Sequence, residues 1–570
     1  MTKFKNSKAK LLAIFGSFCF ILSCQNDLEL LEVKDSSYLE KTSNFSRTAK
    51  KLRNPYTVEN MRKAFKKLKE KGLNKSSPNA GRIMEAFDIE TSHLYVMYEP
   101  ETIEEEAEIK QDSTLILADY PLDYDFTQEE LDARPALTEG EIPEYYTAIR
   151  IDSEQASDDS YILMDELYIP EEDPYFDGIY PSIAKTTNPN VINNKEDLLR
   201  HLLYEAYKLT GNEAELEQVP LESGRWIFGS KWWPSGTIMV YDEIAGANKP
   251  VTGTKILIRQ WFTVRQAITN GSGYFSTASV RGSARYVIQW EGYNYSIRNG
   301  SFFQAETRGP VKKNEAWNHT ITGGDDKYHT LIHQAANDYY YGTRFGLTSP
   351  PRNGTWKKQM KIAAREINGK SSTVKAREIW TGAQISIKVW GHQPDKVYGT
   401  TIHELAHAAH REVDASSYNN VLYDAYTNPC ISGGGDCHNL GPTADNNRRL
   451  LETWPTTVEI LFVLDRYKIK FGLSNYNVYT YNRLNNLQYQ ETYKERYYTS
   501  AGYDMLDNYN QRVLGYNYPI DRVNGYTINQ LEQALVGAKS WWQWRENIKK
   551  KYDNPTEIYL DELFNNWEYL

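Results

Sequence analysis

The sequence is short of positive charge, cysteine and histidine, and it contains only one strongly apolar run. Its 570 residues include 65 Lys and Arg against 75 Asp and Glu, which gives a formal net charge of -10. A protein that binds nucleic acid needs a basic surface to release the counterions of the phosphate backbone, so this class is excluded. A chain of this length is expected to divide into two to four domains.

The apolar run lies near the N-terminus, at residues 11–22, directly after a lysine-rich start. A membrane-spanning helix needs about 20 apolar residues, so this run predicts the core of a signal peptide instead. The residues Ile21-Leu-Ser-Cys24 resemble the lipobox of bacterial lipoproteins. The resemblance implies that residues 1–24 form a lipoprotein signal and that lipidated Cys24 anchors the chain at the bacterial cell envelope, in the outer membrane or at the cell surface. An ordinary secretory signal with an incidental cysteine is the alternative.

No other segment is apolar enough to cross a membrane, so the lipid anchor is the expected membrane contact. Beyond the anchor only two cysteines remain, Cys430 and Cys437, in a glycine-rich stretch. In an oxidising compartment so close a pair predicts a local disulfide, which would stabilise the fold by roughly 2–3 kcal/mol. His438 follows directly, so a metal site is the alternative, although no second ligand pair stands nearby.

Changes in composition divide the chain into four further parts, and the expected class is multidomain α+β. Residues 25–80 are mostly polar with one amphipathic stretch, which predicts a tether and a docking helix. Residues 81–225 combine an acidic helical stretch with short apolar runs, including 113–117, which predicts a small acidic α+β domain. Residues 226–315 alternate strand patterns with turn signals and predict an all-β domain.

The all-β part resembles the carboxypeptidase regulatory-like domain, which is a small β-sandwich. Three pieces carry the resemblance, namely residues 236–242, 250–253 and 269–275. In that family the module is an accessory, so the resemblance implies no chemistry for this part of the chain.

The motif with the clearest chemistry lies in the last part, residues 316–570, where His403 and His407 flank Glu404 in the order His-Glu-Leu-Ala-His. Two histidines four residues apart lie on one face of a helix, so both imidazoles can bind one ion. The glutamate between them can take a proton from a metal-bound water. The pattern predicts one catalytic zinc ion, Zn²⁺, on a helix that begins near Val397. An ordinary amphipathic helix is the alternative.

A catalytic zinc ion needs a third protein ligand. The metzincin pattern requires glycine at 410 and histidine at 413, but the chain has His410 and Val413, so that family is excluded. His410 could be a ligand, a substrate contact or a structural residue. A glutamate from a following helix is the remaining solution, and Glu452 and Glu459 both qualify. They would lie about 10 Å apart on one helical face, so only one can bind.

Glu452 is the predicted third ligand, because Glu-Thr-Trp from residue 452 resembles the start of this helix in gluzincin-like bacterial lipoproteins. Glu459 is the fallback ligand, or else a capping-box partner of Thr456. The resemblance to gluzincins covers roughly residues 325–470 and implies a zincin-like metallopeptidase domain that hydrolyses peptide or protein substrates.

Two other functions stay open at this point. The chain could be a surface lipoprotein that binds or supports other molecules on an inactive zincin-like scaffold. It could also use zinc to hydrolyse a bond other than a peptide bond. The tyrosine-rich C-terminal region could supply a donor for the substrate carbonyl, but the sequence does not single out one residue.

Overall fold

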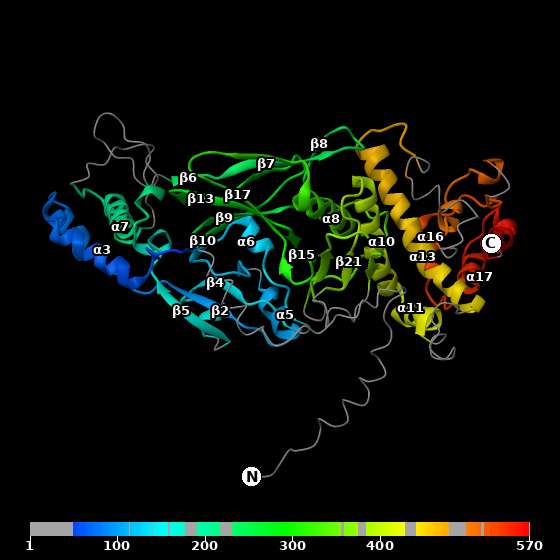
Figure 1. Cartoon of the computed structure of the whole chain (residues 1–570), viewed down its shortest axis with the longest axis horizontal. Helices are drawn as coiled ribbons and strands as arrows, with labels where there is room; N and C mark the ends of the chain where they lie inside the picture. Colours follow the sequence, from blue (N-terminus) through cyan, green and yellow to red (C-terminus); the bar gives the residue numbers. More distant parts are fainter. Residues whose placement is uncertain are drawn as a thin grey trace, which may run out of the picture.

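The computed structural model describes residues 50–568, except 113, 139–140, 158–159, 177–190, 217–230, 355–357, 374–382, 428–440, 478–480, 482–497 and 515–517. The described residues form a mixed α+β structure with several sheets (Figure 1), which confirms the expected class at this level. Within this part of the chain no helix combines the length and apolarity needed to span a membrane. Cys24, Cys430, Cys437 and His438 lie outside the described residues.

The N-terminal part contains a three-stranded antiparallel sheet in the order β4-β2-β5. Its strands are β2 (His93–Tyr98), β4 (Tyr145–Arg150) and β5 (Tyr161–Leu167). Helices α3 (Val58–Glu70) and α7 (Lys195–Thr210) pack against each other at one end of the molecule (Figure 1). The amphipathic stretch of residues 25–80 is therefore a helix, and its buried face joins the core of the acidic part.

The apolar run at residues 113–117 forms no strand in its described residues, 114–117. The carboxylate of Asp112 accepts the N–H of Thr114 at 2.8 Å, which makes a local turn. The carbonyl of Ile116 accepts the Thr147 hydroxyl at 3.1 Å. Side-chain hydrogen bonds of this kind compete with strand pairing.

The all-β part contains two sheets whose side chains share one buried cluster. One sheet has the order β10-β9-β13-β17, with bounds Thr263–Ile268, Lys255–Gln260, Ala284–Gln289 and Glu306–Lys312. The other has the order β11-β7-β18, with bounds Tyr274–Ser276, Ser235–Asp242 and Trp317–Ile321, and β8 (Ala247–Pro250) also pairs with β7.

Strand pairing crosses the expected boundary at residue 315 in both directions. Strand β18 follows this boundary but pairs in parallel with β7. Strand β15 (Tyr295–Asn299) precedes it but pairs in parallel with β19 (Met360–Ala364). Strand β19 continues the sheet to β21 (Ile385–Ile387) and to the antiparallel edge strand β20 (Ser372–Thr373).

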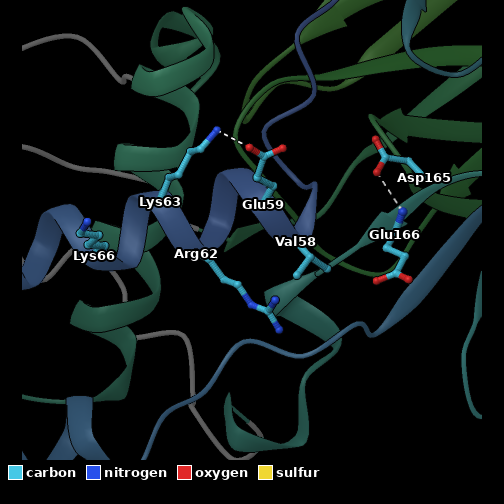
Figure 2. A pocket seen from close by; sticks show the side chains of 7 residues that line it. All are labelled: Val58, Glu59, Arg62, Lys63, Lys66, Asp165 and Glu166. Atoms are coloured by element: carbon cyan, nitrogen blue, oxygen red, sulfur yellow. Dashed lines mark hydrogen bonds and ion pairs between the residues drawn. The ribbon is translucent and has the colours of Figure 1, made fainter.

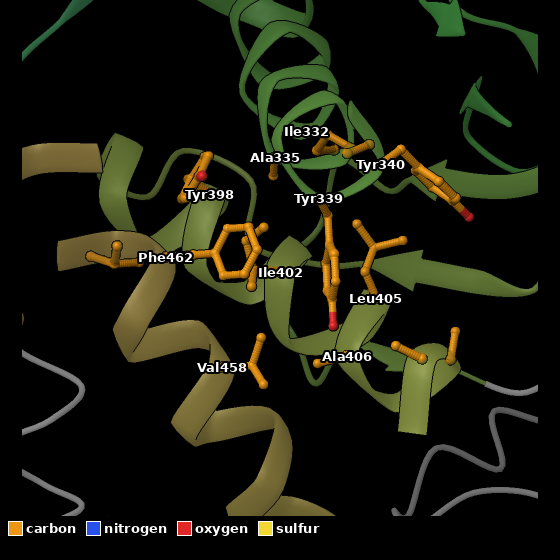
Figure 3. Packing of buried hydrophobic residues seen from close by; sticks show 14 of the residues in the cluster. Ile332, Ala335, Tyr339, Tyr340, Tyr398, Ile402, Leu405, Ala406, Val458 and Phe462 are labelled. Atoms are coloured by element: carbon orange, nitrogen blue, oxygen red, sulfur yellow. The ribbon is translucent and has the colours of Figure 1, made fainter. Parts of the chain in front are cut away.

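Three helices cover this region: α8 (Gly324–Tyr341), α10 (Pro394–Val413) and α13 (Gly441–Leu464). Proline suits the first turn of α10, where no partner for its missing N–H is needed. Figure 3 shows apolar side chains of all three helices meeting in one core, with Tyr339 from α8, Leu405 from α10 and Phe462 from α13. Burial of each large apolar side chain contributes roughly 1.5–3 kcal/mol, so this core holds α10 firmly against α13.

Helix α13 continues through Pro455 without ending there. Thr456 and Glu459 therefore lie inside the helix, well after its first residue, Gly441. The capping-box interpretation of this pair is wrong, because a capping box can form only at a helix N-terminus.

Candidate metal centre

Helices α10 and α13 bring His403, His407 and Glu452 together. The Nε2 atoms of the two histidines lie 3.2 and 3.4 Å from Oε2 of Glu452. One donor atom of each residue lies within 4.8 Å of the other two. The side chain of His403 is 3 % exposed and those of His407 and Glu452 are each 11 % exposed, so the cluster is largely buried.

These donors fit a catalytic zinc ion, which commonly has two or three histidines, a carboxylate and one open position. Burial acts to raise the pKa of Glu452, but His407 and the hydrogen bonds to His403 and His407 hold it well below its ordinary range. The carboxylate is therefore ionised. Two imidazole nitrogens and one negative charge, converging in a buried place, match what a divalent cation of this type requires.

Glu459 lies on the other side of the His403 ring. Its Oε2 is 3.0 Å from Nδ1 of His403, and its side chain is almost completely buried, with 1 % exposed. A carboxylate at this nitrogen assigns the proton to Nδ1, which leaves the lone pair of Nε2 for a metal ion. Glu452 and Glu459 thus contact the two different nitrogens of one imidazole, and Glu459 is not one of the three grouped donors.

Glu404 follows His403 on α10, and its side chain is not one of the three donors. Its Oε2 accepts a hydrogen bond of 2.9 Å from the hydroxyl of Thr373, on the edge strand β20. The same hydroxyl lies 2.8 Å from the Glu404 carbonyl oxygen. Strand β20 therefore contacts the glutamate of the motif through Thr373. No local pattern indicates this contact, since residues 373 and 404 are far apart in the chain.

His410 does not join the donors. It is buried with its ring against Tyr418, at 4.9 Å between ring centroids. Burial, and to a smaller extent the nearby His407, lowers its pKa to about 3. His410 is therefore neutral and packed in the core.

Two tyrosines lie near the group formed by His403, His407 and Glu452. The amino-acid composition alone could not identify these two tyrosines. The ring of Tyr498 lies 6.1 Å from the ring of His403. The hydroxyl of Tyr426 lies 3.5 Å from Oε1 of Glu452. Tyr498 belongs to the tyrosine-rich C-terminal region, whereas Tyr426 lies before α13.

A separate surface groove of about 570 Å³ lies between α3 and the end of β5. Figure 2 shows Arg62, Lys63 and Lys66 on the helix and Asp165 and Glu166 on the strand. Charges of both signs line it, and it has no histidine or cysteine. Helix α3 lies at one end of the molecule and α10 toward the other (Figure 1), so the groove is distinct from the metal cluster.

No protein-family model, no curated protein and no solved structure matches the chain. The function proposed next therefore rests on the residues of this chain and on their geometry.

Proposed function

We propose that the chain is a zinc-dependent peptidase of the gluzincin type, in which His403, His407 and Glu452 bind one catalytic Zn²⁺. The observation that carries the proposal is the grouping of these three donors within 4.8 Å. The grouping joins a two-histidine motif on one helix to a glutamate on another, as a catalytic zinc site needs. The histidine motif also contains Glu404, which supplies a proton acceptor beside the ion.

When bound, zinc would lower the pKa of a coordinated water toward about 7 and polarise the scissile carbonyl. Glu404 accepts a proton from the attacking water and returns it to the leaving amine. The Thr373 hydroxyl, 2.9 Å from Oε2 of Glu404, holds one carboxylate oxygen and leaves the other to exchange the proton. Tyr426 and Tyr498 are the candidates to donate a hydrogen bond to the developing oxyanion.

The setting of the enzyme is part of the proposal. Cys24 would be lipidated and residues 1–23, which precede it, would be removed, and the anchored protein would act on peptides or proteins at the bacterial cell envelope. Cys430 and Cys437 would form a disulfide. The two sheets that contain β7 and β9 would form a regulatory-like β-sandwich that serves as an accessory to the peptidase.

The proposal is tested by elemental analysis of the purified full-length protein, followed by incubation with a proteome-derived peptide library. We expect one zinc ion per chain and new cleavage products that a chelator prevents. Absence of zinc after purification in zinc-containing buffer would refute the proposal. Zinc without cleavage of any peptide would favour the binding or structural lipoprotein on a zincin-like scaffold.

A further inference from the structure

We propose that Tyr481 is a positioning residue of the metal site, and that Gly399 is a glycine because it must admit the Tyr481 hydroxyl. The inference rests on the proposed zinc site. It adds that the affinity for the metal depends on a residue that follows α13 and acts through Glu459.

A continuous series of contacts connects Tyr481 to the metal cluster. The Tyr481 hydroxyl donates to Oε1 of Glu459 at 2.5 Å. The other oxygen of the same carboxylate, Oε2, accepts from Nδ1 of His403 at 3.0 Å. All three side chains are buried, with exposed fractions of 3 % or less for the residues. The carboxylate is thus held at both oxygens, and its orientation decides the orientation of the His403 ring.

Gly399 provides evidence that is independent of these hydrogen bonds. It lies in the interior of α10, where glycine costs about 1 kcal/mol relative to alanine. A Cβ atom at this position would overlap the Tyr481 hydroxyl and would lie 3.1 Å from Oε1 of Glu459. Helix α10 therefore has no side chain at position 399, where the Tyr481 hydroxyl meets the Glu459 carboxylate.

The hydroxyl matters because a buried carboxylate oxygen without a donor is costly. Without the Tyr481 hydroxyl, the Glu459 carboxylate would rotate toward another donor and would no longer hold Nδ1–H of His403 in place. Replacement of outer-shell partners of metal ligands typically costs 10–100-fold in metal affinity. Since Tyr481 acts through Glu459, we expect an effect near the lower limit of this range.

The test compares Tyr481→Phe with Tyr476→Phe in the full-length protein. Tyr476 is a matched control, because it is also buried and its hydroxyl donates to a carboxylate of α10, Oδ2 of Asp395, at 2.8 Å. The dissociation constant for zinc is measured by competition with a chromogenic chelator, and far-ultraviolet circular dichroism checks the fold. We expect Tyr481→Phe to weaken zinc binding about tenfold and Tyr476→Phe to leave it unchanged.

Gly399→Ala supplies a second variant, which adds a methyl group where the hydroxyl lies. It should weaken zinc binding at least as much as Tyr481→Phe. In the Tyr481→Phe background its effect should be smaller, because the two changes disturb the same contact. Equal zinc affinity of wild type, Tyr481→Phe and Gly399→Ala would overturn the inference and leave the zinc peptidase intact. A wild type without zinc would overturn both.

Discussion

The assignment of Glu452 as metal ligand and of Glu459 as the partner of a ligand leads to a quantitative prediction for two matched variants, Glu452→Gln and Glu459→Gln. Both changes remove one negative charge and keep the side-chain volume. Glu452 offers the only formal charge among the three donors, with Oε2 at 3.2 and 3.4 Å from the two Nε2 atoms. Glu459 contacts His403 at the other ring nitrogen, Nδ1, at 3.0 Å.

The expected magnitudes follow from these positions. Removal of one partner from a buried charged group costs about 3–5 kcal/mol, so Glu452→Gln should weaken zinc binding by at least about 100-fold. The glutamine in Glu459→Gln still accepts a hydrogen bond from Nδ1–H of His403. Its effect should stay near the lower limit for outer-shell changes, about tenfold.

The assay is a chelator competition at pH 7.5 with the full-length protein, and the free energy of unfolding of the metal-free variants serves as the control for folding. If Glu459→Gln loses more zinc affinity than Glu452→Gln, the two roles are reversed and the ligand assignment is refuted.

Two further predictions concern stability. Burial raises the pKa of Asp507 to about 6, above an unfolded value of about 3.9. The folded state therefore prefers the neutral acid, and wild type should lose stability as pH rises through 6, whereas Asp507→Asn should not. The variant should gain roughly 2–3 kcal/mol at pH 8 and nothing at pH 4, measured by urea titration; an equal gain at both pH values would contradict this. Leu405 is fully buried in the core of α10, so Leu405→Ala should lower the free energy of unfolding by about 2–5 kcal/mol. Ile469, which is 68 % exposed, is the control. Ile469→Ala should change the free energy of unfolding by less than about 0.5 kcal/mol. Similar effects of the two alanine variants would show that α10 is not held by this core.

Local patterns were enough to predict the helix that carries the motif. The histidine spacing and the apolar residues around it indicated a helix from near Val397, and the structure has α10 from Pro394 to Val413. Helix α10 has an apolar face with helical spacing, and this signal depends only on neighbours in the sequence.

The pairing of distant segments could not be predicted in this way. Strands β15 and β19 lie side by side in parallel, but no local pattern indicates which strand a segment will join. The role of Glu459 was missed for a related reason. The spacing of Thr456 and Glu459 fits a capping box, whereas packing of α13 against α10 continues the helix through Pro455.

The central claim, that Glu404 exchanges a proton beside a zinc ion, is tested most directly by comparing wild type with Glu404→Gln. Both proteins are analysed for zinc content and for the cleavage rate of a peptide that wild type hydrolyses. We predict one zinc ion per chain in both proteins and a loss of at least about 100-fold in kcat for the variant. Equal cleavage rates at equal zinc content would contradict the claim.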